Sequence, residues 1–189
     1  MNREYWDNFY KKQKTIKEPS DFAVFCYQNY IKDKKEQSLI DIGCGNFRDS
    51  IYFIKNGIMT YSLDQIDLDI VDKSIFYFHS LIEDFDIMSV DHYYMRWLIH
   101  AIDELEEIKL FNWLEKSCQK NSYIYIECRS DKDMNIIGDN HYRRTINIDE
   151  LSQKIKHIGF EILYLEENRG FSKIGEDDPL LIRLVSVKK

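Results

Sequence analysis

One stretch decides the expected fold: Ser38-Leu39-Ile40-Asp41-Ile42-Gly43-Cys44-Gly45-Asn46-Phe47-Arg48-Asp49-Ser50. The apolar run 39–42 is too short for a buried helix and is flanked by turn residues, so it predicts a β-strand. Gly43 and Gly45 can adopt backbone conformations that a Cβ forbids, and they let a ligand approach the main chain. The stretch therefore predicts a strand, a tight turn and the start of a helix.

The composition bounds the class of protein. The chain has 189 residues, 44% of them hydrophobic, which fits one domain (1–189) with a substantial core. A net charge of −7 argues against a general nucleic-acid binder, because phosphates are neutralised by a surplus of Lys and Arg. Residues 1–7 lack the apolar core of a signal peptide, and no apolar run approaches membrane-spanning length. The four cysteines show no CxxC spacing, which indicates reduced thiols rather than a zinc site or disulfides. We therefore expect a cytoplasmic protein that binds neither metal, membrane nor nucleic acid.

Strand and helix patterns alternate along the chain. Strands are expected at 59–64, 74–79, 90–95, 123–128, 160–165 and 180–187. Helices are expected at 5–10, from Ser20, at 47–56, from about Asp103, and from Asn147 to Gly159, and 67–72 could form one or two helical turns. The inward residues of the helix from Asp103 should be Leu105, Ile108, Phe111 and Leu114. This βαβ spacing predicts a largely parallel sheet covered on both faces.

Ligands of such sheets bind at the carboxyl ends of the strands, where the glycine turn, Asp64, Arg96 and Glu127 all fall. A dinucleotide site would have a third glycine, but Gly45 is followed by Asn46-Phe47-Arg48. Asp41 would repel a pyrophosphate and suits an ammonium group instead. Asp64, 19 residues beyond Gly45, is placed to accept the two hydroxyls of a ribose. A ligand with a ribose and an ammonium but no phosphate is S-adenosylmethionine; an NAD-dependent oxidoreductase is the rival.

Two segments carry a family resemblance. Leu39-Ile40-Asp41-Ile42-Gly43-Cys44-Gly45-Asn46 resembles the first motif of class I S-adenosylmethionine-dependent methyltransferases, and Ser62-Leu63-Asp64-Gln65 resembles their second. The resemblance implies a three-layer Rossmann-like fold whose seven-stranded, mostly parallel sheet has an antiparallel last strand. It implies that helices within 1–36 cover the cofactor site, although the aromatic face of 5–10 also fits plain packing. The implied cofactor contacts are Tyr10, Asp41, Gly43, Cys44, Gly45, Asp64, Gln65, Leu81, Ile82 and Met95.

A narrower resemblance concerns the acceptor. Three segments are similar to a methyltransferase subgroup associated with bacterial capsule and surface-polysaccharide gene clusters: Met95-Arg96-Trp97-Leu98-Ile99-His100-Ala101-Ile102, His141-Tyr142-Arg143-Arg144 and Asp177-Asp178-Pro179-Leu180-Leu181-Ile182-Arg183. Enzymes of this subgroup are proposed to methylate a phosphoramidate on a capsule precursor. The resemblance implies a small anionic acceptor, bound in part by a loop at 129–145.

Methyl transfer is an in-line displacement, in which orientation of the reactants can be worth about 7–11 kcal/mol. An acceptor that carries a proton can also need a general base. The candidate catalytic residues are His100, His141 and Arg96, and the candidate substrate-binding residues are Glu127, Arg129, Tyr142, Arg143 and Arg144. Converging guanidinium groups suit an anion. Alternatively, His100 is a packed core residue and each arginine pairs with a nearby acid, as we expect for Arg169. A non-catalytic protein that binds the cofactor is a third possibility.

Overall fold

The computed structural model describes residues 3–12, 18–70, 72–86, 88–133, 144–173 and 177–189. Within these ranges a seven-stranded sheet has the order β3-β2-β1-β4-β5-β7-β6. The strands are β1 (Ser38–Ile42), β2 (Met59–Asp64), β3 (Phe76–His79), β4 (His92–Arg96), β5 (Tyr123–Arg129), β6 (Phe160–Asn168) and β7 (Leu181–Lys188). The helices are α1 (Arg3–Lys12), α2 (Asp21–Cys26), α3 (Arg48–Lys55), α4 (Glu104–Ser117) and α5 (Ile148–His157), with a π-helical turn η1 (Tyr27–Ile31) after α2.

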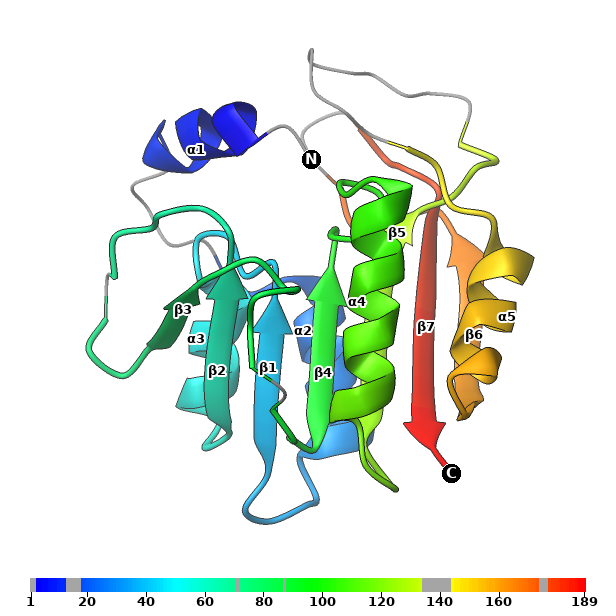
Figure 1. Cartoon of the computed structure of the whole chain (residues 1–189), viewed down its shortest axis with the longest axis horizontal. Coiled ribbons are helices and arrows are strands. Elements are labelled where there is room, and N and C mark those ends of the chain that lie inside the picture. Colours follow the sequence, from blue (N-terminus) through cyan, green and yellow to red (C-terminus); the bar gives the residue numbers. More distant parts are fainter. Residues whose placement is uncertain (1–2, 13–17, 71, 87, 134–143, 174–176) are drawn as a thin grey trace.

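The strand directions follow the expected pattern. β1 pairs in parallel with both β2 and β4, β2 with β3, and β4 with β5. β7 is antiparallel to both of its neighbours, β5 and β6. The prediction of a mostly parallel Rossmann-like sheet with an antiparallel last strand is confirmed. The strand order places β1 and β4 side by side, so the carboxyl ends of β2, β1 and β4 share one edge of the sheet (Figure 1).

Helices cover both faces of the sheet, and each face has its own core (Figure 1). On one face, Leu114 of α4 and Ile155 of α5 belong to a buried cluster with Ile40 of β1. On the other, Phe22 of α2 and Phe53 of α3 belong to a second cluster that includes aromatic residues of β4 and β5. α1 lies across the carboxyl edge of the strands and packs on neither face (Figure 1). Because helices cover both faces of the sheet, its carboxyl edge is where we look for a ligand site.

Local sequence signals account for the helix ends. Ser20 caps α2 by accepting a hydrogen bond from Ala23 N (3.0 Å), and Asp103 forms a reciprocal capping box with Glu106 at the start of α4. Asn147 accepts from the amides of Asp149 and Glu150 at the start of α5. These caps confirm the helix starts expected at Ser20, Asp103 and Asn147.

Two local expectations were wrong. Leu105 and Ile108 are 61% and 57% exposed, whereas Leu110 and Trp113 face the core with Phe111 and Leu114. The buried stripe of α4 runs through Glu107, whose charge is paired in the interior, so hydropathy alone misplaces the inward face. Residues 67–70 and 72 form no helix. There, Asp64 Oδ1 accepts a hydrogen bond from Ile66 N and Tyr77 donates to Ile66 O, which holds the chain in a bend.

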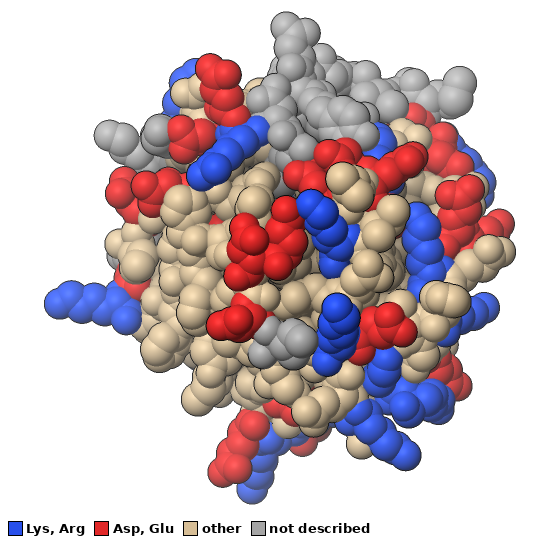
Figure 2. All heavy atoms as spheres, viewed as in Figure 1, with Lys and Arg blue, Asp and Glu red and all other residues tan. Residues whose placement is uncertain are grey.

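The surface is mixed in charge. Acidic and basic side chains are interspersed over the face that carries α4 (Figure 2). No helix in the described part of the chain is long and apolar enough to cross a membrane.

Candidate functional site

A cavity of about 580 Å³ is lined by residues from the carboxyl ends of β1, β2 and β4 and by residues of α1. The ribbon shows α1 lying across that edge of the sheet (Figure 1). Its walls come from the glycine turn, the end of β2, residues 80–83, the end of β4, the start of α4 and residues 172–173. Aromatic side chains of α1 close it from above: Tyr5, Trp6, Phe9 and Tyr10. The cavity therefore lies where the sheet topology places a ligand.

The glycine turn is shaped by its backbone. Gly43 and Gly45 have φ of +76° and +53°, in the left-handed region. The amide of Gly43 donates to Leu63 O (2.8 Å), which ties the turn to the end of β2. A Cβ on Gly45 would lie 2.4 Å from the Tyr10 hydroxyl, so α1 approaches the turn as closely as a glycine permits. Both predicted glycines are in place, and any side chain there would push against the cavity wall.

Asp64 is the last residue of β2, the strand next to β1 in the sheet. Its Oδ2 accepts from Gly45 N (3.0 Å) and its Oδ1 from Ile66 N (3.1 Å). Burial raises the pKa of Asp64, although these amides act in the opposite direction. Because the carboxylate also lines the cavity, it presents a fixed acceptor to any hydroxyl that enters.

Asp41 lies at the end of β1 and is almost fully buried. It accepts a hydrogen bond from Ser50 Oγ (2.6 Å), which in turn accepts from Ser62 Oγ (2.9 Å). Burial, followed by repulsion from Asp49, raises the pKa of Asp41 to about 8. Neither Asp41 nor Asp64 forms an ion pair with a lysine or arginine of the described residues. The two carboxylates form a region that would be stabilised by a cation.

Other expected cofactor contacts divide into two groups. Gln65, Leu81, Ile82 and Cys44 line the cavity. The Nε2 of Gln65 is buried without a hydrogen-bond partner, so it is a donor available to a ligand. Met95, in contrast, is fully buried in the core and is absent from the cavity wall.

Tyr10 of α1 lines the cavity and lies against Gly45 of the glycine turn. Burial, and next the charge of Asp64, raise the pKa of the Tyr10 phenol, which places it close to the acidic wall. Trp6 stacks on it with ring centroids 5.9 Å apart. The aromatic side chains of α1 therefore pack against one another and also cover the glycine turn.

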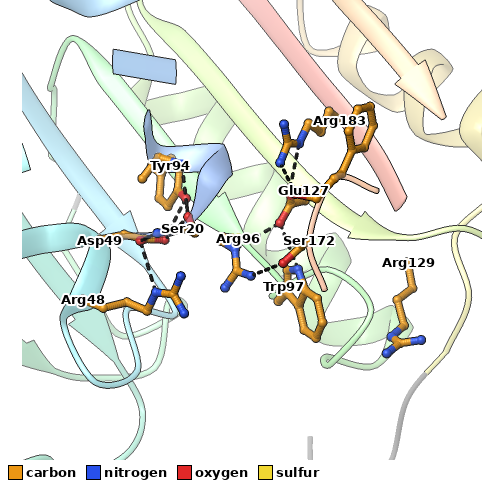
Figure 3. Close-up of polar contacts among 12 residues, drawn as sticks. Ser20, Arg48, Asp49, Tyr94, Arg96, Trp97, Glu127, Arg129, Ser172 and Arg183 are labelled. Atoms are coloured by element: carbon orange, nitrogen blue, oxygen red, sulfur yellow. Dashed lines mark hydrogen bonds and ion pairs between the residues drawn. The ribbon is translucent and has the colours of Figure 1, made fainter. Parts of the chain in front are cut away.

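Arg96 and Glu127 end the adjacent strands β4 and β5. Arg96 lines the cavity, and its Nε donates to Glu127 Oε1 at 3.0 Å. Glu127 is fully buried and also accepts from Trp97 Nε1 (3.0 Å) and Arg183 Nε (2.7 Å) (Figure 3). With both oxygens bonded inside the protein, Glu127 holds other side chains and contributes nothing to the cavity wall. The expectation that it contacts substrate is corrected accordingly.

Two of the expected substrate arginines point inward instead. Arg129 is 2% exposed and pairs with Asp133 and Asp177. Arg144 donates to the carbonyls of Ile99 and Ile102 and pairs with Glu107. Asp133 lies only four residues from Arg129, but Asp177 and Glu107 lie 48 and 37 positions from their arginines, and no local pattern predicts those two pairs. Neither side chain lines the cavity.

Arg169 has the structural role expected of it, since it pairs with Asp133 and donates to Asp178 O. His141, Tyr142 and Arg143 lie outside the described residues.

His100 is a buried, hydrogen-bonded residue. It is 2% exposed, and its Nδ1 accepts from the amide of Arg129 (3.2 Å). Its ring packs edge-on against Trp97, with centroids 5.6 Å apart, and it is absent from the cavity wall. Of its two sequence-based interpretations, the structure matches the packed core residue.

Among the cavity-wall residues that the sequence-based prediction did not name are Arg48, Trp97, Ser172 and Lys173. Arg48 directly follows the glycine turn, a position that could have drawn attention to it. Trp97 has φ of +60°, which is a strained conformation for a bulky residue and typical of functional sites. Ser172 and Lys173 come from the β6–β7 connection, and only the folded chain brings them to β4.

Comparison with known proteins gives the fold class. No family model matches the chain, and no curated protein matches it. Solved structures do match, and the chain has the Rossmann-like fold of the S-adenosylmethionine-dependent methyltransferases among them.

Three of these structures illustrate the likeness. The 1,6-didemethyltoxoflavin-N1-methyltransferase of Burkholderia thailandensis, solved with S-adenosylhomocysteine, superposes with a TM-score of 0.72 at 9% identity over 99% of this chain and 84% of its own. TehB of Haemophilus influenzae gives 0.70 at 15% identity over 99% and 67%. A putative methyltransferase in complex with the Haloferax volcanii activator Trm112 gives 0.75 at 10% identity over 99% and 97%. At these identities the likeness establishes the fold.

Proposed function

We propose that this chain is an S-adenosylmethionine-dependent methyltransferase that acts on a small anionic acceptor. The observation that carries the proposal is the pair Asp41 and Asp64, buried at the ends of adjacent parallel strands and not ion-paired with a lysine or arginine of the described residues. A ligand with a positive charge beside Asp41 and hydroxyls beside Asp64 would compensate both carboxylates. S-adenosylmethionine carries an ammonium, a sulfonium, a ribose and one carboxylate, and no phosphate.

The rest of the cavity wall fits this cofactor. The Nε2 of Gln65 lacks a partner and can donate to a polar ligand atom. Leu81 and Ile82 offer an apolar surface and backbone groups for the adenine, and Tyr10 of α1 covers the glycine turn. The rival NAD-dependent oxidoreductase would have to place a pyrophosphate beside Asp41, and an anion there disfavours the charged form of this carboxyl, which would gain no compensating charge.

When bound, S-adenosylmethionine supplies a methyl group already activated by its sulfonium. The protein's own contribution is then to orient the two reactants and to exclude water. The rings of Trp6, Phe9 and Trp97 in the cavity wall serve the second purpose. His100 is not proposed as a general base, because its Nδ1 already accepts from the main chain and the ring is absent from the wall.

A direct binding experiment tests the proposal. Titration calorimetry should detect S-adenosylhomocysteine binding and no binding of NAD at equal concentration. If NAD binds and S-adenosylhomocysteine does not, the oxidoreductase replaces the methyltransferase. If S-adenosylhomocysteine binds but methyl transfer is undetectable with a panel of phosphorylated and phosphoramidate-bearing sugars, the non-catalytic alternative gains.

We further propose that the acceptor belongs to cytoplasmic biosynthesis of a capsular or surface polysaccharide. The support is the sequence resemblance of 95–102, 141–144 and 177–183 to that methyltransferase subgroup. The neighbouring genes provide the test: a polysaccharide gene cluster supports this assignment, and an unrelated operon removes it.

A further inference from the structure

We propose that Arg48 and Arg96 form a two-arginine subsite that binds the anionic group of the methyl acceptor, a carboxylate or a phosphoryl group. The proposal rests on the proposed function, which assigns the acidic side of the cavity to the methyl donor. It replaces the arginines suggested by the sequence, of which Arg129 and Arg144 are committed to interior acids.

Two hydrogen bonds fix the orientation of Arg96, and its guanidinium keeps further N–H groups that can donate. Its Nε donates to Glu127 Oε1 (3.0 Å) and its Nη2 to Ser172 Oγ (3.1 Å). These bonds use two of the five N–H groups of a guanidinium. The remaining three have no hydrogen-bond partner within the described ranges, and the side chain lines the cavity. Arg96 is therefore a pre-oriented donor whose free edge faces the ligand space.

Arg96 shares its ion-paired carboxylate with a second arginine. Glu127 is shared between two guanidinium groups, those of Arg96 and Arg183, and its remaining contact is the neutral Trp97 indole. Arg183 also donates to Phe171 O (2.8 Å) and is absent from the cavity wall. One carboxylate thus pairs with two guanidinium groups, and of these two only Arg96 lines the cavity, where the charge of Asp49 also acts on it.

Arg48 completes the pair from the start of α3. Its Nε lies 3.5 Å from Asp49 Oδ1, which is an ion pair rather than a hydrogen bond. Asp49 already accepts from Ser20 N (2.7 Å), Ser20 Oγ (2.7 Å) and Tyr94 OH (2.9 Å). The two Nη groups of Arg48 have no hydrogen-bond partner in the described part of the chain. The Nε of Arg48 is thus held by an ion pair, while its two Nη groups can donate to a ligand.

The two open guanidinium groups line one cavity and point toward one another in the close-up (Figure 3). Like charges in a partly enclosed site repel, and an anion between them would relieve that repulsion. A guanidinium matches the oxygens of a carboxylate or phosphoryl group with two parallel hydrogen bonds. Lys173 lines the same cavity and adds a third positive charge.

The position of Arg96, at the end of the cavity away from Asp64, favours the acceptor over the donor. Asp64, Gln65 and residues 80–82 lie at the ends of β2 and β3, whereas Arg96 ends β4, two strands away from β2 in the sheet order. Arg96 also has Ser172 of the β6–β7 connection as its neighbour, on the side away from β2. A donor seated over Asp41 and Asp64 leaves this arginine end of the cavity for the molecule that receives the methyl group.

The test is an anion titration of the protein saturated with S-adenosylhomocysteine. Inorganic phosphate, and separately acetate, are titrated by calorimetry into wild type, Arg48→Gln, Arg96→Gln and the charge-matched control Lys189→Gln at the exposed end of the chain. We expect wild type to bind phosphate with a dissociation constant on the order of 1 mM, from two charge-assisted contacts. Each arginine variant should weaken this binding about tenfold or more, and Lys189→Gln should leave it unchanged.

The other outcomes are distinct. If wild type binds S-adenosylhomocysteine but no anion, or if the arginine variants bind anions as wild type does, the subsite is wrong and the proposed function stands. If wild type does not bind S-adenosylhomocysteine, the proposed function itself fails. If the variants weaken S-adenosylhomocysteine but not 5′-methylthioadenosine, which lacks the amino-acid tail, the arginines hold the donor's carboxylate and the inference is overturned.

A folding control accompanies these measurements. Arg96→Gln removes a partner of the buried Glu127 and could lower stability, so each variant is also unfolded thermally. Arg48→Gln removes only a 3.5 Å ion pair at a partly exposed position and serves as the variant least affected by folding.

Discussion

The two sides of the cavity differ in how well the sequence predicted the residues that line them. On the β1–β2 side, most of the expected residues line the cavity: Asp41, Gly43, Cys44, Asp64 and Gln65. On the β4–β5 side, Glu127, Arg129 and Arg144 turned out to be bonded inside the protein, while Trp97 and Ser172 line the cavity unpredicted. The first side is built by backbone turns next to the residues concerned. The second depends on which charged partner each long side chain meets after folding.

The largest effect should come from Glu107, which pairs Arg144 and Lys154 in the interior. Glu107→Ala leaves both cations without their carboxylate. Because Lys154 is half exposed, we expect a loss of about 3 kcal/mol in the free energy of unfolding, at the lower end for a broken buried pair. Urea denaturation measures the loss. The affinity of the folded variant for S-adenosylhomocysteine should equal that of wild type. If the variant is as stable as wild type but binds S-adenosylhomocysteine much more weakly, the structural role assigned to Arg144 is contradicted.

Asp64→Asn should produce the next largest effect. It removes the charge that accepts from Gly45 N and Ile66 N and that faces the cavity. We expect about 100-fold weaker S-adenosylhomocysteine binding, because two charge-assisted hydrogen bonds are involved. Asp69→Asn, on the exposed segment after β2, is the matched control. Equal affinities for the two variants would contradict the ribose assignment on this side of the cavity.

Asp41 should make cofactor binding depend on pH. Its pKa of about 8 means that the ligand-free carboxyl is largely protonated at pH 7, and a cationic ligand favours the charged form. Binding below pH 8 should therefore release a proton, and affinity should rise by up to about tenfold per pH unit from pH 6 to 8. Calorimetry in two buffers of different ionisation enthalpy counts the protons. Asp41→Asn should abolish the release, and release that persists in this variant would assign it to another group.

The same shift has a consequence for the ligand-free protein. The folded pKa lies above the ordinary value of 3.8, so the folded state holds a proton that the unfolded chain has lost. The contribution of Asp41 to stability is complete at pH below about 4 and is lost as the pH rises toward 8. A ligand-free stability curve that is steeper in wild type than in Asp41→Asn over this window would agree.

His100 should show the smallest effect. Its Nδ1 accepts from Arg129 N, so His100→Leu leaves a buried amide unpaired and should cost about 1–2 kcal/mol of unfolding free energy. His100→Asn can offer an oxygen near the same place and should recover part of that loss. Identical stabilities for the two variants would remove the structural role assigned to this histidine.

Much of the fold was predictable because its signals are local. The run 39–42, the glycines at 43 and 45, and the caps Ser20, Asp103 and Asn147 act through neighbouring backbone groups, and each lies where it was expected. The prediction of the inward face of α4 was wrong because the partners that bury Glu107 are distant in the sequence. A buried Glu107 looks like a surface residue until Arg144 and Lys154 are brought to it from more than 35 positions away.

The sequence by itself determined the strand–turn–helix unit and the acids beside it, because backbone geometry and a carboxylate one residue from a strand end depend on near neighbours. Only the tertiary structure decided which arginines are available to a ligand. Guanidinium groups are long and form ion pairs readily, so their direction depends on the acids that folding places within reach. Asp133, Asp177 and Glu107 engage Arg129 and Arg144, whereas Arg48 and Arg96 keep free donors at the cavity.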